Sequence, residues 1–192
     1  MISIQDLMRV ANLKGYKIFE NDSRPYNINH WGIRSSGGEF NDEFHLFWKH
    51  EGNWSHLIHK GTTDPGKYYL ENPLNEKGCA ILPEGQYLGG WELGRHKGAY
   101  DAWVQRKEVK VFRDNDRNAE LDLNKLSDEG WYGINHHRAH AELEVPKIGK
   151  YSAGCQARLN PYEYAEFISV SKKASVIWGN ALSYTLINID DL

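Results

Sequence analysis

The sequence has few cysteines, no long apolar run and no strong excess of either charge. Its two cysteines, Cys79 and Cys155, could form at most one disulfide, which is too few to hold 192 residues together. No apolar run approaches the roughly 20 residues that a helix needs to cross a bilayer. A net charge of −3 gives no basis for non-specific nucleic-acid binding. The first residues, Met1 to Met8, lack the basic and long apolar segments of a secretory signal, so none is expected.

Hydrophobic and aromatic residues are plentiful. Hydrophobic residues make up 40% of the chain, with 7 tryptophans and 11 tyrosines, so we expect one domain, residues 1–192, with a substantial core. Alternating aromatic segments between turn residues predict a mainly β fold, either a sandwich or a partly closed barrel. The expected strands lie in a meander over 16–60, with hairpin tips at Gly37-Gly38 and Gly52-Asn53, and over 86–93, 102–112 and 183–189.

Two helices have clear start signals. Ser3 is a suitable N-cap for a helix over 3–13, with Gly15 as its end, in the segment 1–15. Asn160 followed by Pro161 and Glu163 predicts a helix that runs to about Lys173, so that 160–192 forms a helix and a final strand.

The segment from His137 to Cys155 carries the most distinctive chemistry. His137 lies eighteen positions before Cys155, which closes the turn Ser152-Ala153-Gly154-Cys155. A thiol is nucleophilic as its thiolate, and a neighbouring imidazole can take the proton. Backbone N–H groups around Gly154 and Cys155 could hold the oxygen of a tetrahedral intermediate. From these residues alone, a buried structural cysteine after a Ser/Gly turn, with unrelated surface histidines, is the favoured interpretation, because one cysteine and one histidine are weak evidence of catalysis.

The residues before this segment predict how His137 is presented. In an extended 131–137, Asn135 and His137 share one face and His136 points the other way, so Asn135 could orient an active-site group. Ser152 and Asn135 are expected to hold the imidazole or the turn in place, and Asn135 is also a candidate substrate contact. His140 is an alternative base. Cys79 is expected to be a small buried residue.

These residues resemble the signature of the L,D-transpeptidase catalytic domain (YkuD-like), a histidine followed after a gap by Ser/Thr-His-Gly-Cys. Here fourteen residues separate His137 from Ser152, and Ala153 replaces the second histidine. The segment Gly61 to Tyr69 resembles the Thr-Pro-x-Gly-x-Phe/Tyr start of a strand in the same family, so the resemblance covers about 58–159. The variant Gly133 to Arg138 with Ser-Ala-Gly-Cys-Gln is also similar to bacteriophage-encoded proteins.

The resemblance implies a cofactor-independent cysteine acyl-transfer enzyme that acts on peptidoglycan stem peptides by transpeptidation or hydrolysis. It implies Cys155 as nucleophile and His137 as base, with Ser152 and Gly154 in the catalytic turn. A phage enzyme, or a protein delivered to the bacterial cell wall by other machinery, would suit a chain with no signal peptide. A non-catalytic wall-binding or virion module with the same fold is the alternative.

Two further residues are candidate substrate contacts. Arg138 could bind a stem-peptide carboxylate as a planar fork, or be a solvated strand-end arginine. His96 could contact substrate, act in a zinc peptidase with Asp101, or lie on the surface.

No metal site is predicted. His45, His50, His56 and His59 do not have the spacing of a zinc site. Oxygen-bearing side chains alternate from Asp114 to Asp122 as in a calcium loop, but Ala119 and Lys125 stand where an EF-hand has Gly and Glu. A solvated turn is therefore predicted there, with calcium as the minor alternative.

Overall fold

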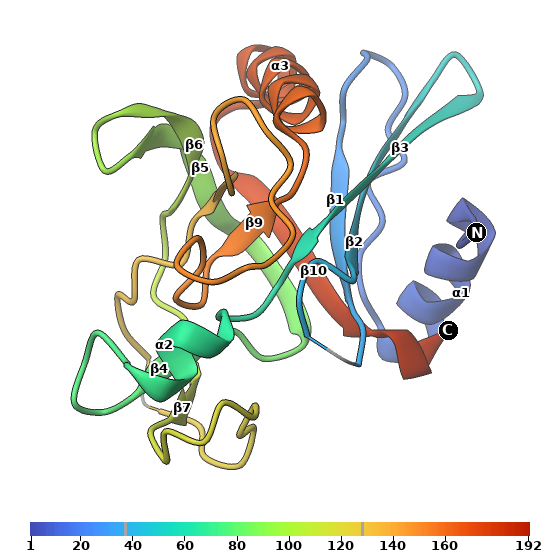
Figure 1. Ribbon diagram of the computed structural model, residues 1–192. Helices are drawn as coiled ribbons and strands as arrows, with labels where there is room; N and C mark the ends of the chain where they lie inside the picture. Colours follow the sequence, from blue (N-terminus) through green and yellow to red (C-terminus); the bar gives the residue numbers. More distant parts are fainter. Residues whose placement is uncertain (37, 128) are drawn as a thin grey trace.

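The chain is built mainly of β-strands. The structure, a computed structural model, describes residues 1–36, 38–127 and 129–192; in that part, eight strands close a barrel and two form a separate sheet (Figure 1). The barrel order is β1 (Asn29–Arg34), β10 (Leu182–Asn188), β5 (Gly85–His96), β6 (Tyr100–Gln105), β8 (His136–Arg138), β9 (Gln156–Arg158), β3 (Asn53–Thr62) and β2 (Asp42–His50). The small sheet pairs β4 (Cys79–Ile81) with β7 (Phe112–Asp114). The mainly β prediction is confirmed, and the barrel is closed, neither a sandwich nor partly open.

The N-terminal helix, α1 (Ile4–Lys14), forms as predicted. The Ser3 hydroxyl accepts from the Asp6 N–H at 3.2 Å, the Asp6 carboxylate accepts from the Ser3 N–H at 2.9 Å, and Gly15 ends the helix at a φ of 68°. This reciprocal cap satisfies N–H groups that a helix start leaves free. The apolar face of α1 packs against the outside of the barrel, on Trp31, Ile33, Phe47 and Ile187.

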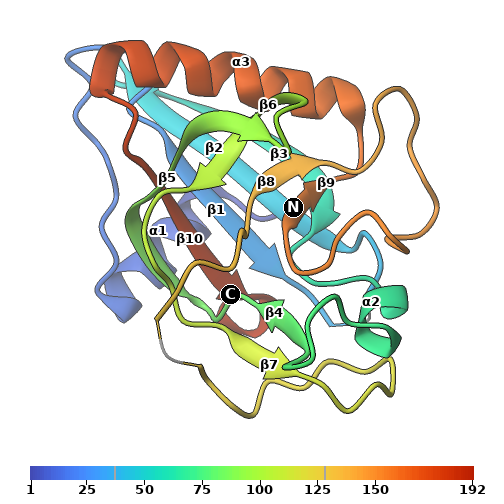
Figure 2. The same ribbon diagram turned by 90° about the vertical axis from the view of Figure 1, so that its left-hand side faces the viewer.

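The second predicted helix, α3 (Pro161–Trp178), lies across the barrel (Figure 2). Asn160 caps it by accepting from the N–H groups of Tyr162 at 2.8 Å and Glu163 at 3.2 Å. It extends past the predicted end near Lys173, because no helix-breaking residue occurs before Gly179. Its buried face consists of Tyr164, Phe167, Ile168, Val170, Ser171 and Ala174.

Two of the predicted strands are wrong. Residues 16–19 form no strand, because the Lys17 and Phe19 N–H groups donate to the side chains of Gln86 and Asn29, not to a neighbouring strand. The strand start expected near Lys67 is instead a short helix, α2 (Lys67–Glu71).

Two other strands are shorter than predicted. The strand over 102–112 is interrupted after Gln105, because the N–H groups of Arg106 and Lys107 both donate to the Gly90 carbonyl. The extended segment 131–137 joins the barrel only from His136. The hairpin tip at Gly52 is confirmed between β2 and β3, and Gly37 of the other expected tip lies outside the described residues. The chain ends after β10 in the short 3-10 helix η1 (Ile189–Asp191).

The barrel interior contains histidines and an arginine among aromatic rings. The Arg158 guanidinium lies 3.5 Å from the centroid of the Phe167 ring and donates to ring nitrogens of His30 at 2.9 Å and His59 at 3.1 Å. His136 packs 4.5 Å from the Tyr184 ring. All are buried, and burial lowers the pKa of Arg158 to about 9. The interior is thus a packed core.

Candidate active site

A cavity of about 410 Å³ separates the end of the barrel from the β4–β7 sheet. It brings together His96, Asn135, His137, Gly154 and Cys155, five residues chosen from the sequence. Its other lining residues are Tyr69, Leu74, Asn75, Gly78, Cys79, Ala80, Lys97, Arg113, Trp131, Tyr132, Gly133, Ile134, Tyr151 and Ala153. Both Cys155 and His137 therefore face one space large enough for a small peptide.

Parallel pairing of β8 and β9 positions Cys155 and His137, the candidate nucleophile and base. His137 pairs with Ala157, and the Gln156 N–H donates to the Asn135 carbonyl at 2.9 Å. Cys155 directly precedes β9, so this register brings it beside the start of β8. His136 points into the barrel core while His137 lines the cavity, which confirms the predicted alternation.

Cys155 carries a free thiol. It donates to the Gly133 carbonyl and accepts from the Asn135 N–H, each at 3.5 Å from the sulfur. Burial raises the pKa of the Cys155 thiol, although the Asn135 N–H and the charge of Lys97 oppose this shift. Cys79 is also free and buried, as predicted, and donates to the Tyr69 carbonyl at 3.0 Å. No disulfide blocks the proposed nucleophile.

The turn before Cys155 is held by Ser152. Its hydroxyl donates to the Cys155 carbonyl at 2.8 Å and accepts from the Gly154 N–H at 3.2 Å. Ser152 is thus a positioning residue for the turn, and the expected use of the Gly154 N–H as an oxyanion donor is not supported, because that group is already bonded. In the described part of the chain the Cys155 N–H has no partner, which leaves it available to an oxyanion.

Gly154 is required by the shape of this turn. Its φ of 124° lies in the region that favours glycine, and an added Cβ would lie 2.0 Å from the Ala80 carbonyl oxygen of β4. The absence of a side chain at Gly154 lets the turn pack closely against β4 of the small sheet.

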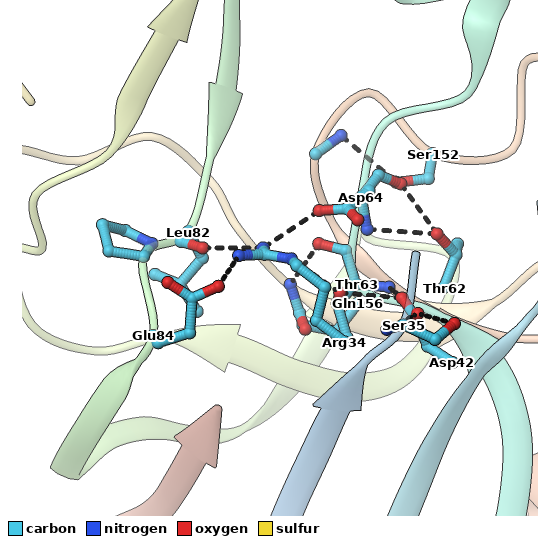
Figure 3. Close-up of polar contacts among 12 residues, drawn as sticks. Arg34, Ser35, Asp42, Thr62, Thr63, Asp64, Leu82, Glu84, Ser152 and Gln156 are labelled. Carbon is cyan, nitrogen blue, oxygen red and sulfur yellow. Dashed lines mark hydrogen bonds and ion pairs between the residues drawn. The ribbon is translucent and has the colours of Figure 1, made fainter. Parts of the chain in front are cut away.

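A buried ionic network supports the turn from below (Figure 3). Arg34, at the end of β1, forms ion pairs with Asp64 at 2.9 Å and Glu84 at 2.6 Å. Asp42 accepts from both the N–H and the hydroxyl of Thr63, at 2.6 and 2.8 Å. These bonds fix the loop that follows β3.

That loop contacts the cysteine turn directly. The Gly66 N–H donates to the Ser152 carbonyl at 2.9 Å. The Gln156 side chain donates to the Thr63 carbonyl at 3.2 Å (Figure 3). Sequence reasoning did not identify Arg34, because its partners are far apart in the chain. A single arginine in a predicted strand does not indicate which acidic residues pair with it in the fold.

One ring nitrogen of His137 already has a hydrogen-bond partner. Its Nδ1 lies 2.8 Å from the Arg138 carbonyl oxygen, which can only accept, so Nδ1 carries the proton and Nε2 a lone pair. Burial lowers the pKa of His137 to about 4, with a further contribution from His96 and Lys97. The neutral imidazole is therefore in the form of a base.

The His96 imidazole has the opposite tautomer. The Gln105 N–H donates to Asn135 Oδ1 at 3.2 Å, so the Asn135 amide nitrogen faces His96 and donates to its Nδ1 at 3.1 Å. The proton of His96 must then be on Nε2. Asn135 thus orients His96, where the sequence favoured a direct contact with His137 or the turn.

The two rings stack with centroids 4.4 Å apart and planes 27° from parallel. Neither Nε2 has a hydrogen-bond partner in the described part of the chain. Nor does any hydrogen bond join His137 to Cys155 among these residues. The cavity is therefore lined by the His137 imidazole with a free lone pair, the His96 imidazole with a free N–H, and the Cys155 thiol. The thiol and the His137 imidazole are not hydrogen-bonded to each other.

Two other candidates, Arg138 and His140, do not line this cavity. The Arg138 guanidinium is 4.4 Å from the Tyr100 ring centroid and does not line the cavity, so the expected carboxylate contact there is not supported. His140 Nδ1 accepts from the N–H groups of Glu142 and Leu143, which leaves it a poor alternative base.

Asp101 is paired with Lys172 at 2.6 Å and Arg95 at 3.6 Å. Over residues 1–36, 38–127 and 129–192, no group of three or more His, Cys, Asp or Glu side chains is arranged to hold a metal. The zinc-peptidase alternative, with Asp101 beside His96, therefore lacks a ligand set.

Comparison with models of known protein families, with curated proteins and with solved structures found no match. In the part of the chain that the structure describes, none of the helices has the length and apolar character needed to cross a membrane.

Proposed function

We propose that the protein is a cysteine acyl-transfer enzyme that acts on peptidoglycan stem peptides, as an L,D-transpeptidase or an L,D-peptidase. The observation that carries this proposal is the shared cavity of Cys155 and His137, in which His137 has its basic nitrogen free. The similarity to the L,D-transpeptidase signature supports the substrate class. Lys97 and Arg113 on the cavity wall add positive charge suited to the carboxylates of stem peptides.

In this mechanism His137 Nε2 takes the thiol proton as Cys155 Sγ attacks the peptide carbonyl. The oxyanion of the tetrahedral intermediate accepts from the Cys155 N–H and from His96 Nε2–H. The C–N bond then breaks as His137 returns the proton to the leaving amine, and a thioester remains. An amine or water attacks the thioester and releases the thiol.

The alternative is a non-catalytic wall-binding module. The missing contact between His137 and Cys155 favours it, together with the raised pKa of the Cys155 thiol. Catalytic contacts often tighten only when substrate binds, so this geometry is also compatible with an enzyme. Wall binding retained by Cys155→Ala, with no turnover by the native protein, would establish the alternative.

The first test is turnover. Native protein incubated with stem tetrapeptide and pentapeptide fragments should release the terminal residue or join two stems, as measured by liquid chromatography and mass spectrometry. Cys155→Ser should reduce the rate at least about 10³-fold, because the hydroxyl is a far weaker nucleophile here. Equal rates for the two proteins would sink the proposal.

The second test is the pH dependence of kcat/KM. Since the pKa of His137 is lowered to about 4, the imidazole stays a neutral base throughout the neutral range. Since the Cys155 pKa is raised, the thiol stays protonated until alkaline pH. We expect a rate that changes little from about pH 6 to 7.5 and rises above about pH 8. An acid limb centred near pH 7 would instead indicate a thiolate–imidazolium pair.

A further inference from the structure

The cavity beside Cys155 is lined by positive charge alone. Lys97 and Arg113 lie on its wall, and among the described residues that line it there is no aspartate or glutamate. A cavity lined by charges of one sign concentrates the electric field and attracts a ligand of the opposite sign. The ligand of this cavity is therefore expected to carry an anionic group.

The two cations lie near different cysteines. Burial raises the pKa of both thiols; the charge of Lys97 opposes this shift at Cys155, and the charge of Arg113 opposes it at Cys79. Arg113 is also held in place, because its guanidinium donates to the Gly78 carbonyl at 3.0 Å. Since interactions between charges weaken with distance, Lys97 is the cation that lies closer to the nucleophile.

Lys97 has no acidic partner in the described part of the chain, and the acids of its own hairpin pair with other residues. Glu92 of β5 pairs with Arg106 at 3.8 Å. Asp101 of β6 pairs with Lys172 at 2.6 Å. The exposed ammonium of Lys97 is therefore free to pair with a ligand.

The backbone at Lys97 is strained. In the turn that joins β5 to β6, Lys97 adopts a left-handed φ of 49°, which glycine or asparagine adopts at lower cost. Lys97 directly follows His96, whose ring stacks on His137 with centroids 4.4 Å apart. Strained residues cluster at sites of function, so a lysine in this conformation, beside the catalytic groups, points to a role in binding.

We propose that Lys97 binds the free α-carboxylate of the C-terminal residue of a stem peptide, so that the protein cuts the last peptide bond of a stem and not an internal or cross-linked one. This inference rests on the proposed function. In a terminal residue only the α-carbon separates the carboxylate from the amide nitrogen that leaves. A carboxylate paired with a cation near Cys155 therefore brings the last peptide carbonyl to the thiol, and the flexible lysine stem can follow the ligand.

The first test compares a stem tetrapeptide that has a free C-terminus with the same peptide as a C-terminal amide, which lacks the charge. For the native protein, kcat/KM should be roughly 5–20-fold higher for the acid than for the amide. Lys97→Gln should remove this preference, and Lys97→Arg, which keeps the charge, should retain most of it. Lys110→Gln, at an exposed position that does not line the cavity, is the matched control and should show the native preference.

The comparison of acid and amide separates carboxylate binding from an effect on the thiol. A charge that acted only on Cys155 would matter equally for both peptides. Equal losses of kcat/KM for the two peptides in Lys97→Gln, or a preference that this substitution leaves unchanged, would therefore overturn the proposal.

A binding measurement keeps the test independent of turnover. Cys155→Ala, titrated with each tetrapeptide and followed by amide NMR, should bind the acid roughly 5–20-fold more tightly than the amide, and adding Lys97→Gln should remove the difference. If no peptide is turned over but this difference is found, the acyl-transfer proposal fails and the carboxylate site stands. Equal affinities, or no binding of either peptide, would overturn the carboxylate site.

Discussion

Lowering the pH from 7 to 5 is expected to destabilise the protein by about 4 kcal/mol through His30 and His136 alone. Both are buried in the barrel core, and burial lowers the pKa of each well below 6.5, with the charge of Arg158 lowering it further. Below about pH 6.5 the unfolded chain takes up protons that the folded chain excludes. Stability is therefore fully present above that pH and is lost as the pH falls, by about 1.4 kcal/mol per unit for each histidine.

This loss is a large part of the roughly 5–15 kcal/mol that typically separates folded from unfolded chains. Urea denaturation at several pH values, followed by the fluorescence of the buried Trp31, Trp91 and Trp103, measures it directly. His45, His59 and His137 have lowered pKa values, to about 4, 3 and 4, and act in the same direction.

The variant His136→Phe tests whether protonation of the buried histidines, and not of other groups, causes the loss of stability at low pH. Among the residues that the structure describes, neither ring nitrogen of His136 has a hydrogen-bond partner. The substitution therefore removes no observed bond and should reduce the loss between pH 7 and 5 by about 2 kcal/mol. Phe167→Leu should lower stability by a similar amount at every pH. Equal pH dependence in His136→Phe and the native chain would contradict the assignment.

Gly154→Ala is expected to destabilise the protein by roughly 2–5 kcal/mol and to reduce the proposed acyl transfer at least about 10²-fold. The alanine is strained at a φ of 124°, and its Cβ meets the Ala80 backbone oxygen, which no side-chain rotation can relieve. The turn must shift, and Cys155 shifts with it. Thermal denaturation and initial rates of stem-peptide turnover measure the two effects.

Gly149→Ala is the matched control. Gly149 also has a positive φ, 46°, in the same connection before Cys155, but nothing lies within 4 Å of an added Cβ. It should show only the backbone strain, about 1 kcal/mol, and nearly native rates. If the two variants behave alike, the fit between the turn and β4 does not position Cys155.

The elements that the sequence predicted well are those coded locally. Ser3 with Asp6, and Asn160 with Pro161, define helix starts within four residues, and both helices begin where these residues place them. The 102–112 strand failed because one distant carbonyl, that of Gly90, binds two successive N–H groups. Barrel closure also depends on the parallel pairing of β1 with β10, two strands that are far apart in the chain. No local sequence pattern predicts that pairing.

Some features of the candidate site could likewise be predicted from the sequence, and others could not. The spacing of His137 and Cys155 was visible in the sequence, and both line one cavity. The donor role of His96 was not visible, because its tautomer follows from Asn135 and, behind it, from the backbone of Gln105. The Arg34 network was also hidden, since its acids come from separate loops.

The central claim is that Cys155 becomes acylated by a stem peptide with His137 as the base. Acid-quenched reactions, analysed by intact mass and then by peptide mapping, test this most directly. A stem-peptide thioester on the peptide that contains Cys155, greatly reduced in His137→Gln, is the predicted result. A protein that stays unmodified with every stem fragment, or one that carries the adduct on Cys79, would contradict it.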